Sequence, residues 1–191
     1  MRESKLSRKT NETDIELKIN LDGSGNSDIN TGIAFFDHML NSFAKHGFFD
    51  LTINAHGDLT VDDHHTVEDI GITLGSAIAK ALGDKKGIER FADARVPMDE
   101  ALASAAVDIS GRSFLVFNAK FENPNISGLT SQNVRHFFES VTANAGINAH
   151  LDATGENDHH KAEALFKAFG IALNRAVRVT GSGIPSTKGM L

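Results

Sequence analysis

The chain reads Asp62-Asp63-His64-His65-Thr66-Val67-Glu68 in its first half, and Asn157-Asp158-His159-His160-Lys161-Ala162-Glu163 follows with its histidines 95 positions later. Each copy contains Asp-His-His-x-x-Glu and precedes apolar residues at the spacing of one helix face. An offset of about half the chain is typical of an internal duplication. We therefore expect two halves, residues 1–92 and 93–191, that repeat one order of elements and form one compact unit.

Helical geometry turns the duplicated motif into a prediction about metal ions. On a helix, His64 and Glu68 lie one turn apart on the same face, whereas His65 is rotated by roughly 100°. Two adjacent imidazoles therefore cannot easily reach one ion. The pattern predicts two ions, each bound by the His–Glu pair of one copy and by the odd His of the other copy. Imidazole and carboxylate ligands suit Mn, Zn, Fe or Ni. The alternative is two polar helix starts with surface histidines.

Composition limits the possible classes of function. The chain has 191 residues, a net charge of −6 and no cysteine. The acidic balance argues against a nucleic-acid partner, and the lack of cysteine excludes disulfides and thiolate ligands. No apolar run approaches the roughly 18 residues of a membrane span, and the N-terminus lacks the apolar core of a signal peptide. We expect a cytoplasmic protein without a membrane partner.

Hydrophobic periodicity indicates the same order of elements in both halves. Apolar residues at helical spacing follow each motif, and a shorter helical pattern with one histidine precedes it, at His38 in the first half and His136 in the second. These two histidines stand 26 and 23 residues before their motifs, which raises both from surface residues to candidate ligands. Alternating patterns predict strands between the helices, so an α+β fold with a sheet covered by helices on one face, duplicated, is expected. The predicted strands are 14–21, 48–56, 103–109, 113–121 and 146–153, and the predicted helices are 32–46, 131–145 and one after each motif.

Eight candidate ligands shared over two ions give four each, which leaves open positions on an octahedral ion and so favours catalysis. Arginine and lysine residues at loop ends, and Lys167 one turn beyond Glu163, suggest an anionic substrate, with phosphate the usual one. The candidate ligands are His38, His64, His65, Glu68, His136, His159, His160 and Glu163. The candidate cationic residues are Arg90, Arg112, Lys167 and Lys188.

Five stretches together resemble the imidazoleglycerol-phosphate dehydratase family in its monofunctional form. They are Arg-Lys-Thr-Asn-Glu-Thr from Arg8, Phe-Phe-Asp-His-Met-Leu around His38, the two motifs, and Pro-Ser-Thr-Lys-Gly from Pro185. The resemblance runs from about Arg8 to the end of the chain, and the paired motifs are highly specific.

This resemblance implies a mixed four-stranded sheet in each half, two Mn²⁺ ions per active site and a homo-oligomer of 24 subunits. One ion would take His38, His65, His159 and Glu163, and the other His64, Glu68, His136 and His160. Glu12 would contact the substrate and act as acid or base, beside the catalytic histidines His64, His65, His159 and His160. Arg90, Arg112, Lys167, Ser186, Thr187 and Lys188 would bind the phosphate, and Lys45 and His46 would line the substrate.

The implied reaction is the dehydration of D-erythro-imidazole glycerol phosphate to imidazole acetol phosphate in histidine biosynthesis. An imidazole ring between two cations would be bound as imidazolate and could expel the adjacent hydroxyl, after which Glu12 removes a C–H proton. Two other classes remain open. One is a dinuclear metallohydrolase acting on a phosphorylated or amide substrate. The other is a metal-storage or sensor protein, which the alternating strands disfavour.

Overall fold

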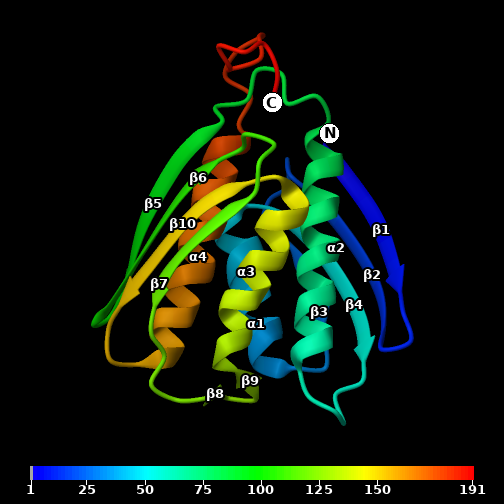
Figure 1. Ribbon diagram of the computed structural model, residues 1–191, viewed down its shortest axis with the longest axis vertical. Coiled ribbons are helices and arrows are strands. Elements are labelled where there is room, and N and C mark those ends of the chain that lie inside the picture. The colour runs from blue at the N-terminus through cyan, green and yellow to red at the C-terminus, as the bar shows by residue number, and fades with distance from the viewer. Residues whose placement is uncertain (1) are drawn as a thin grey trace.

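The computed structural model describes residues 2–191, and two stretches of it have the same order of elements (Figure 1). The first contains β1 (Glu3–Lys9), β2 (Thr13–Asn20), β3 (Ser27–Asn30), α1 (Ala34–Gly47), β4 (Asp50–Gly57) and α2 (His64–Leu82). The second contains β5 (Phe91–Met98), β6 (Ala101–Asp108), β7 (Phe114–Ala119), α3 (Ser131–Ala145), β10 (Asn148–Thr154) and α4 (Asp158–Val177). The second stretch also has a short hairpin before α3, formed by β8 (Asn125–Ile126) and β9 (Leu129–Thr130).

The two four-stranded sheets share one topology. Their strand orders are β1-β2-β4-β3 and β5-β6-β10-β7. In each sheet the strand before the motif helix pairs antiparallel with the second strand, as Ile53 does with Leu17 and Leu151 with Ala105. The same strand pairs parallel with the third strand of its half. The predicted α+β fold of two duplicated halves with mixed four-stranded sheets is thereby confirmed.

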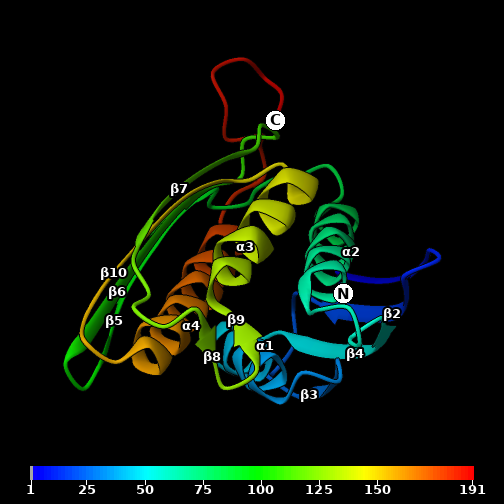
Figure 2. The ribbon, with the colours of Figure 1, turned by 60° about the horizontal axis from the view of Figure 1, so that its bottom comes forward.

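The four helices lie between the two sheets (Figure 2). Helices α1 and α2 pack on the first sheet, and α3 and α4 pack on the second. In the middle of the molecule, α2 packs against α3 and α1 packs against α4. Each of these contacts therefore joins a helix of one half to a helix of the other. None of the helices in residues 2–191 is long and apolar enough to cross a lipid bilayer.

Alternation along the central strands turns one face of each sheet toward the helices. In β2, Ile15, Leu17 and Ile19 are buried while the residues between them are exposed. Phenylalanine rings from the helices fill the centre, where Phe137 stacks on Phe166 with ring centroids 5.2 Å apart. This core fixes how the helices of the two halves meet.

Glycine lets both helix pairs approach closely. A Cβ atom at Gly71 of α2 would lie 2.7 Å from the Cβ atom of Ser140 on α3. A Cβ atom at Gly170 of α4 would lie 2.6 Å from the carbonyl oxygen of Phe43 on α1. Real carbon atoms do not come this close, so the spacing of each pair depends on a missing side chain.

The hydrophobic pattern does not predict β1, β3 or β5, and all three are edge strands. Edge strands often carry charged residues, which protect them from pairing with other chains, and they tolerate proline. Strand β1 has the sequence ESKLSRK, and β5 contains Pro97. Both strands alternate in burial, but the apolar signal is weak because Leu6 is the one inward hydrophobic residue of β1 and two inward residues of β5 are the small Ala92 and Ala94. Helix α3 has the bounds that its pattern predicts.

Candidate metal centres and substrate site

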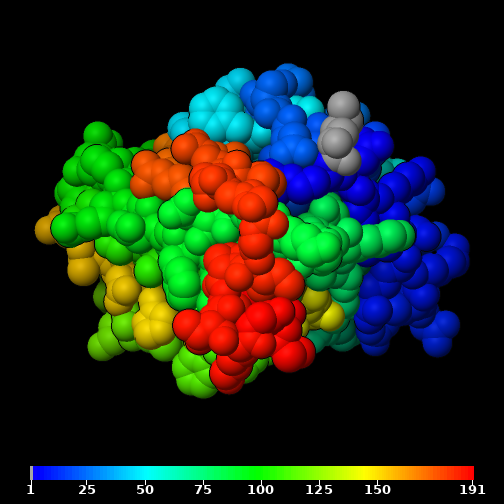
Figure 3. Space-filling model, turned by 90° about the horizontal axis from the view of Figure 1, so that it is seen from above, coloured from blue at the N-terminus to red at the C-terminus, as the bar shows by residue number. Residues whose placement is uncertain are grey.

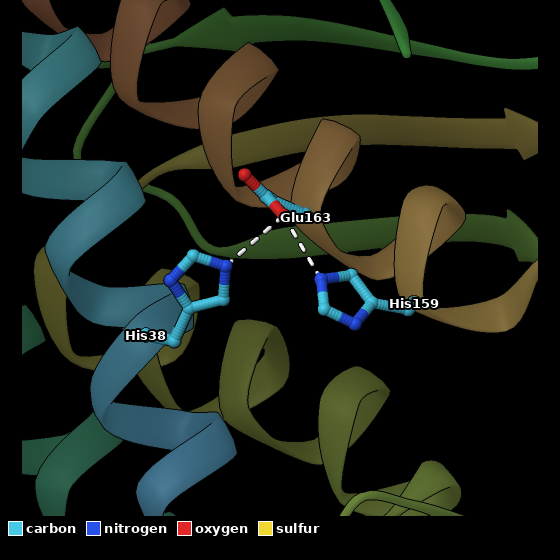
Figure 4. A group of neighbouring side chains, drawn as sticks. All are labelled: His38, His159 and Glu163. Carbon is cyan, nitrogen blue, oxygen red and sulfur yellow. Dashed lines mark hydrogen bonds and ion pairs between the residues drawn. The ribbon is translucent and has the colours of Figure 1, made fainter. Parts of the chain in front are cut away.

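The first cluster of candidate ligands consists of His38 on α1 with His159 and Glu163 on α4 (Figure 4). The Nε2 atoms of both histidines lie 3.1 Å from Oε2 of Glu163. Lys167 contacts the other oxygen of Glu163, with Nζ 2.8 Å from Oε1. Burial raises the pKa of the Glu163 carboxyl, but hydrogen bonds from Lys167 and His38 outweigh burial and bring the pKa to about 2. Glu163 is therefore a carboxylate at neutral pH.

The second cluster consists of His64 and Glu68 on α2 with His136 on α3. Nε2 of His136 lies 3.1 Å from Oε1 of Glu68. The rings of His64 and His136 stack with centroids 4.6 Å apart. Nδ1 of His64 lies 3.2 Å from Oδ1 of Asn133, which can fix the ring tautomer. Each cluster thus combines a motif His–Glu pair from one half with the single helical His of the other half. Helix geometry alone predicted His65 or His160 of the other copy in that place.

The donor set of each cluster fits a divalent metal ion. In each, one atom from every residue lies within 4.8 Å of the others. Neighbouring ligand atoms of an octahedral ion are roughly 2.8–3.1 Å apart when the bonds are about 2.0–2.2 Å long. The His–Glu separations of 3.1 Å are close to this value. Two nitrogens and one carboxylate oxygen would leave positions for further ligands and for substrate.

The residues before each His-His pair fix the start of the motif helix. Asp62 accepts a hydrogen bond from the backbone N–H of His64, at 2.8 Å, and Asn157 accepts one from His159, at 2.9 Å. The next residue in each copy binds a neighbouring segment. Buried Asp63 accepts hydrogen bonds from the backbone N–H and side chain of Thr130, at 2.6 and 2.7 Å. The start of α2 is thereby tied to the start of α3, which places the second cluster.

Asp158 takes the corresponding place at the start of α4. It accepts hydrogen bonds from the backbone amides of Glu122 and Asn123 and pairs with the buried Lys161, whose Nζ lies 2.8 Å away. Burial raises the pKa of Asp158, but hydrogen bonds from Lys161 and the backbone amides outweigh it and bring the pKa to about 2. The loop after β7 is thereby held to the helix that carries the first cluster.

His65 and His160 belong to neither cluster. Their rings stand 6.0 and 6.1 Å from those of His64 and His159, measured between centroids. Nδ1 of His65 lies 3.0 Å from a carboxylate oxygen of Asp58, and this hydrogen bond raises the pKa of His65. The chain therefore brings together three of the four ligands expected for each ion.

Glu12 lies in the turn between β1 and β2, with its Oε1 3.7 Å from Nε2 of His65. The backbone N–H of Glu12 donates to the hydroxyl of Thr10, at 3.1 Å. The neighbouring Thr13 donates to the buried Asp69 of α2, at 2.5 Å. The turn that carries Glu12 is thus tied to the helix that carries the first motif.

Lys167 and His46 lie beside the first cluster. Lys167 is ion-paired with Glu163. Burial and the positive charge of Lys167 lower the pKa of His46. Lys45 precedes His46 in the last turn of α1 and is exposed. These three residues, which were expected to contact substrate, share one region with the first cluster.

The remaining phosphate candidates lie at the opposite end of the molecule. Helix α4 begins with the first cluster and ends at Val177, roughly 20 Å beyond Glu163. The C-terminal segment follows that end and covers the surface there (Figure 3). Arg90 belongs to the same end, because it donates to the carbonyl of Pro185, at 2.8 Å, and to Asp108, at 2.7 Å. Arg112 follows Gly111, which lies beside Leu191, and Ser186, Thr187 and Lys188 belong to the C-terminal segment itself.

Sequence reasoning missed several residues that support the clusters. Asp63 and Asp158 stand in the repeated motif itself, so their repetition was a usable signal. Asp58 and Glu100, which contact His65 and His160, are 7 and 60 positions from their partners. No spacing rule links such residues.

Comparison with known proteins shows which family this chain matches. The model of the family described as imidazoleglycerol-phosphate dehydratase matches residues 31–173. A protein of that name from Methanococcoides burtonii is 60% identical over all of both chains. One from Acetivibrio thermocellus is 55% identical over 100% of this chain and 99% of its own. The crystal structure of the Staphylococcus aureus dehydratase is 39% identical, with a TM-score of 0.84 over 94% of this chain and 99% of its own. That of Pyrococcus furiosus is 35% identical, with a TM-score of 0.85 over 97% of this chain and 100% of its own.

Proposed function

This chain belongs to the imidazoleglycerol-phosphate dehydratase family, and we propose on that basis that it dehydrates D-erythro-imidazole glycerol phosphate to imidazole acetol phosphate in histidine biosynthesis. The observation that carries the proposal is the pair of three-residue clusters, each built from both halves of the chain. A substrate with two ring nitrogens suits a site with two such centres.

Each cluster would hold one Mn²⁺ ion. His38, His159 and Glu163 would hold one, with His65 as the fourth ligand, and His64, Glu68 and His136 would hold the other, with His160. Divalent ions at these positions would supply Lewis-acid chemistry to the imidazole ring of the substrate. The role of the chain is to fix the ligands, and the hydrogen bonds of Asp62, Asp63, Asn157 and Asp158 at the helix starts do so.

A complete site would form between copies of the chain. Two observations support this. His65 and His160 stand apart from the clusters of their own chain. The C-terminal segment, which carries Ser186, Thr187 and Lys188, lies at the opposite end of the molecule from the starts of α2 and α4 (Figure 1), and Arg90 and the Gly111–Arg112 turn contact or adjoin that segment. A homo-oligomer, with 24 subunits as in the family, would bring these groups together, whereas Lys45, His46 and Lys167 already lie near the first cluster.

Glu12 would exchange protons with the substrate carbon. Its side chain is half exposed, on a turn whose backbone is held by Thr10 and Thr13. A carboxylate that is positioned but free of strong ion pairs can accept a C–H proton once neighbouring groups make that proton acidic. The phosphate residues would orient the substrate through a part that does not react.

Incubation of the Mn²⁺-loaded protein with imidazole glycerol phosphate tests the reaction. We expect a product that is lighter by one water and retains its phosphate, detected by mass spectrometry. Release of inorganic phosphate would instead indicate a metallohydrolase, and no turnover with tight metal binding would indicate storage. The Glu12→Gln variant should bind Mn²⁺ and substrate like the parent but lose turnover by about 100-fold or more. An active variant removes Glu12 from the mechanism.

A further inference from the structure

The two histidines outside the clusters make matching hydrogen bonds. Nδ1 of His65 lies 3.0 Å from Oδ2 of Asp58, and Nδ1 of His160 lies 2.9 Å from Oε2 of Glu100. Glu100 is itself held by the backbone N–H groups of Asn157 and Glu156, at 2.7 and 3.2 Å. In both halves, therefore, a carboxylate faces Nδ1 of the second histidine of the His-His pair.

These hydrogen bonds decide which nitrogen of each ring is available. An ionised carboxylate can only accept, so Nδ1 of each ring must carry the hydrogen. Nε2 of the neutral ring then keeps its lone pair. Within residues 2–191, the nearest carboxylates to these Nε2 atoms are Glu12 at 3.7 Å and Asp99 at 3.8 Å, which is beyond hydrogen-bond distance. Both Nε2 atoms are thus left for another partner.

We propose that Asp58 and Glu100 are positioning residues that hold His65 and His160 with Nε2 presented to a metal ion. The proposal rests on the proposed function, which makes these histidines the fourth ligands. A ligating histidine usually donates its other N–H to a carboxylate, which fixes the tautomer and orientation of the ring and makes the ligand more basic.

The two carboxylates come from different positions in the repeat. Glu12 immediately precedes β2 and Glu100 immediately precedes β6, so these two residues occupy equivalent places. In the second half Glu100 is engaged by His160. In the first half Asp58, from the loop after β4, takes the corresponding role for His65. Glu12 is therefore left free for the substrate, and the duplicated position has diverged into one ligand-positioning and one acid–base residue.

Titration of the assembled full-length protein with Mn²⁺ alone, followed by electron paramagnetic resonance of the free ion, tests the assignment without turnover. We expect Asp58→Ala and Glu100→Ala to raise the Kd for Mn²⁺ by about 10–100-fold. Asp58→Asn and Glu100→Gln keep an acceptor and should recover most of the loss. Glu12→Ala should leave the Kd within roughly threefold of the parent, although its position is equivalent to that of Glu100.

The control is Asp14→Ala, which removes an exposed carboxylate close to Glu12 that pairs with Lys9 and should not change the Kd. If an alanine variant fails to fold, Glu100→Asp withdraws the carboxylate by one methylene and should weaken binding in the same way. Unchanged Kd values for Asp58→Ala and Glu100→Ala would overturn this inference but not the proposed function. An increase of the Kd by Glu12→Ala as large as that caused by Glu100→Ala would do the same. A parent protein that binds no Mn²⁺ would overturn the proposed function as well.

Discussion

Gly71→Ala tests whether the spacing of α2 and α3 holds the second cluster together. The added Cβ atom would lie 2.7 Å from Cβ of Ser140 and 3.0 Å from the carbonyl oxygen of Phe137. Neither atom is the end of a flexible side chain, so the helices must move apart. Restoring an ordinary contact of 3.4 Å requires a separation of about 0.7 Å.

A displacement of this size should lower the affinity for metal strongly but reduce the stability of the fold only modestly. Overpacking costs about 1–3 kcal/mol, and replacing glycine by alanine inside a helix returns about 0.5–1 kcal/mol, so a net loss of at most about 2.5 kcal/mol is expected. Ligand distances in metal sites are held within roughly 0.2 Å. Moving Glu68 away from His136 by 0.7 Å should therefore raise the Kd of the ion at the second cluster by about tenfold or more, which corresponds to about 1.4 kcal/mol of binding free energy.

Reciprocal variants make the assay specific. Gly170→Ala places a Cβ atom 2.6 Å from the carbonyl oxygen of Phe43 and should disturb only the first cluster. Mn²⁺ affinity is measured in a Glu163→Ala background, where the second cluster remains, and in a Glu68→Ala background, where the first remains. Gly71→Ala should weaken binding in the first background and Gly170→Ala in the second. Equal effects in both backgrounds, or none, would refute the idea that helix spacing sets each site.

Three further outcomes are expected. Phe166→Ala removes a fully buried ring that contacts Phe137 and Phe138 and should lower the free energy of unfolding by about 3–5 kcal/mol, measured by urea denaturation. Asp158→Asn leaves Lys161 buried without its partner and should cost about 3 kcal/mol at pH 5 in the metal-free protein. Because the pKa of Asp158 is lowered from 3.8 to about 2, this difference should be complete above about pH 4 and disappear as the pH falls toward 2; a constant difference would contradict the pairing. Removal of metal with a chelator should stop turnover but leave the circular dichroism spectrum unchanged, because the helices are held together by a buried core of phenylalanine rings; loss of helix signal would show that the metal is needed for folding.

The repeated motif predicted two sites that each use the His–Glu pair of one half, whereas the place of His38 and His136 in them followed only from the family resemblance. Periodicity identifies strands and helices that bury one face, which is why β2, β4, β6, β10 and all four helices have the expected type. It fails at β1, β3 and β5, because an edge strand is defined by its neighbour and carries few buried residues of its own.

Side-chain partners distant in sequence could not be predicted. Asp58 reaches His65 because the loop after β4 turns back toward the start of α2, and Glu100 reaches His160 because the β5–β6 turn lies beside the start of α4. Arg90 is a further example of a side chain whose partners could not be predicted. Its guanidinium donates to Asp108 and to the carbonyl of Pro185, and no local pattern predicts these two contacts.

The exchange of partner helices between the halves has a consequence for the origin of the chain. Neither half contains all three donors of a cluster, because His38 meets His159 and Glu163, and His136 meets His64 and Glu68. A half-length ancestor could have built such a site only as a two-fold symmetric dimer, in which both centres were identical. Fusion of two such copies would remove that identity constraint. Produced separately, each half should lack these centres as a monomer, and both centres should form when the two halves are refolded together. Metal binding at these residues by one half that remains monomeric would contradict a dimeric ancestor.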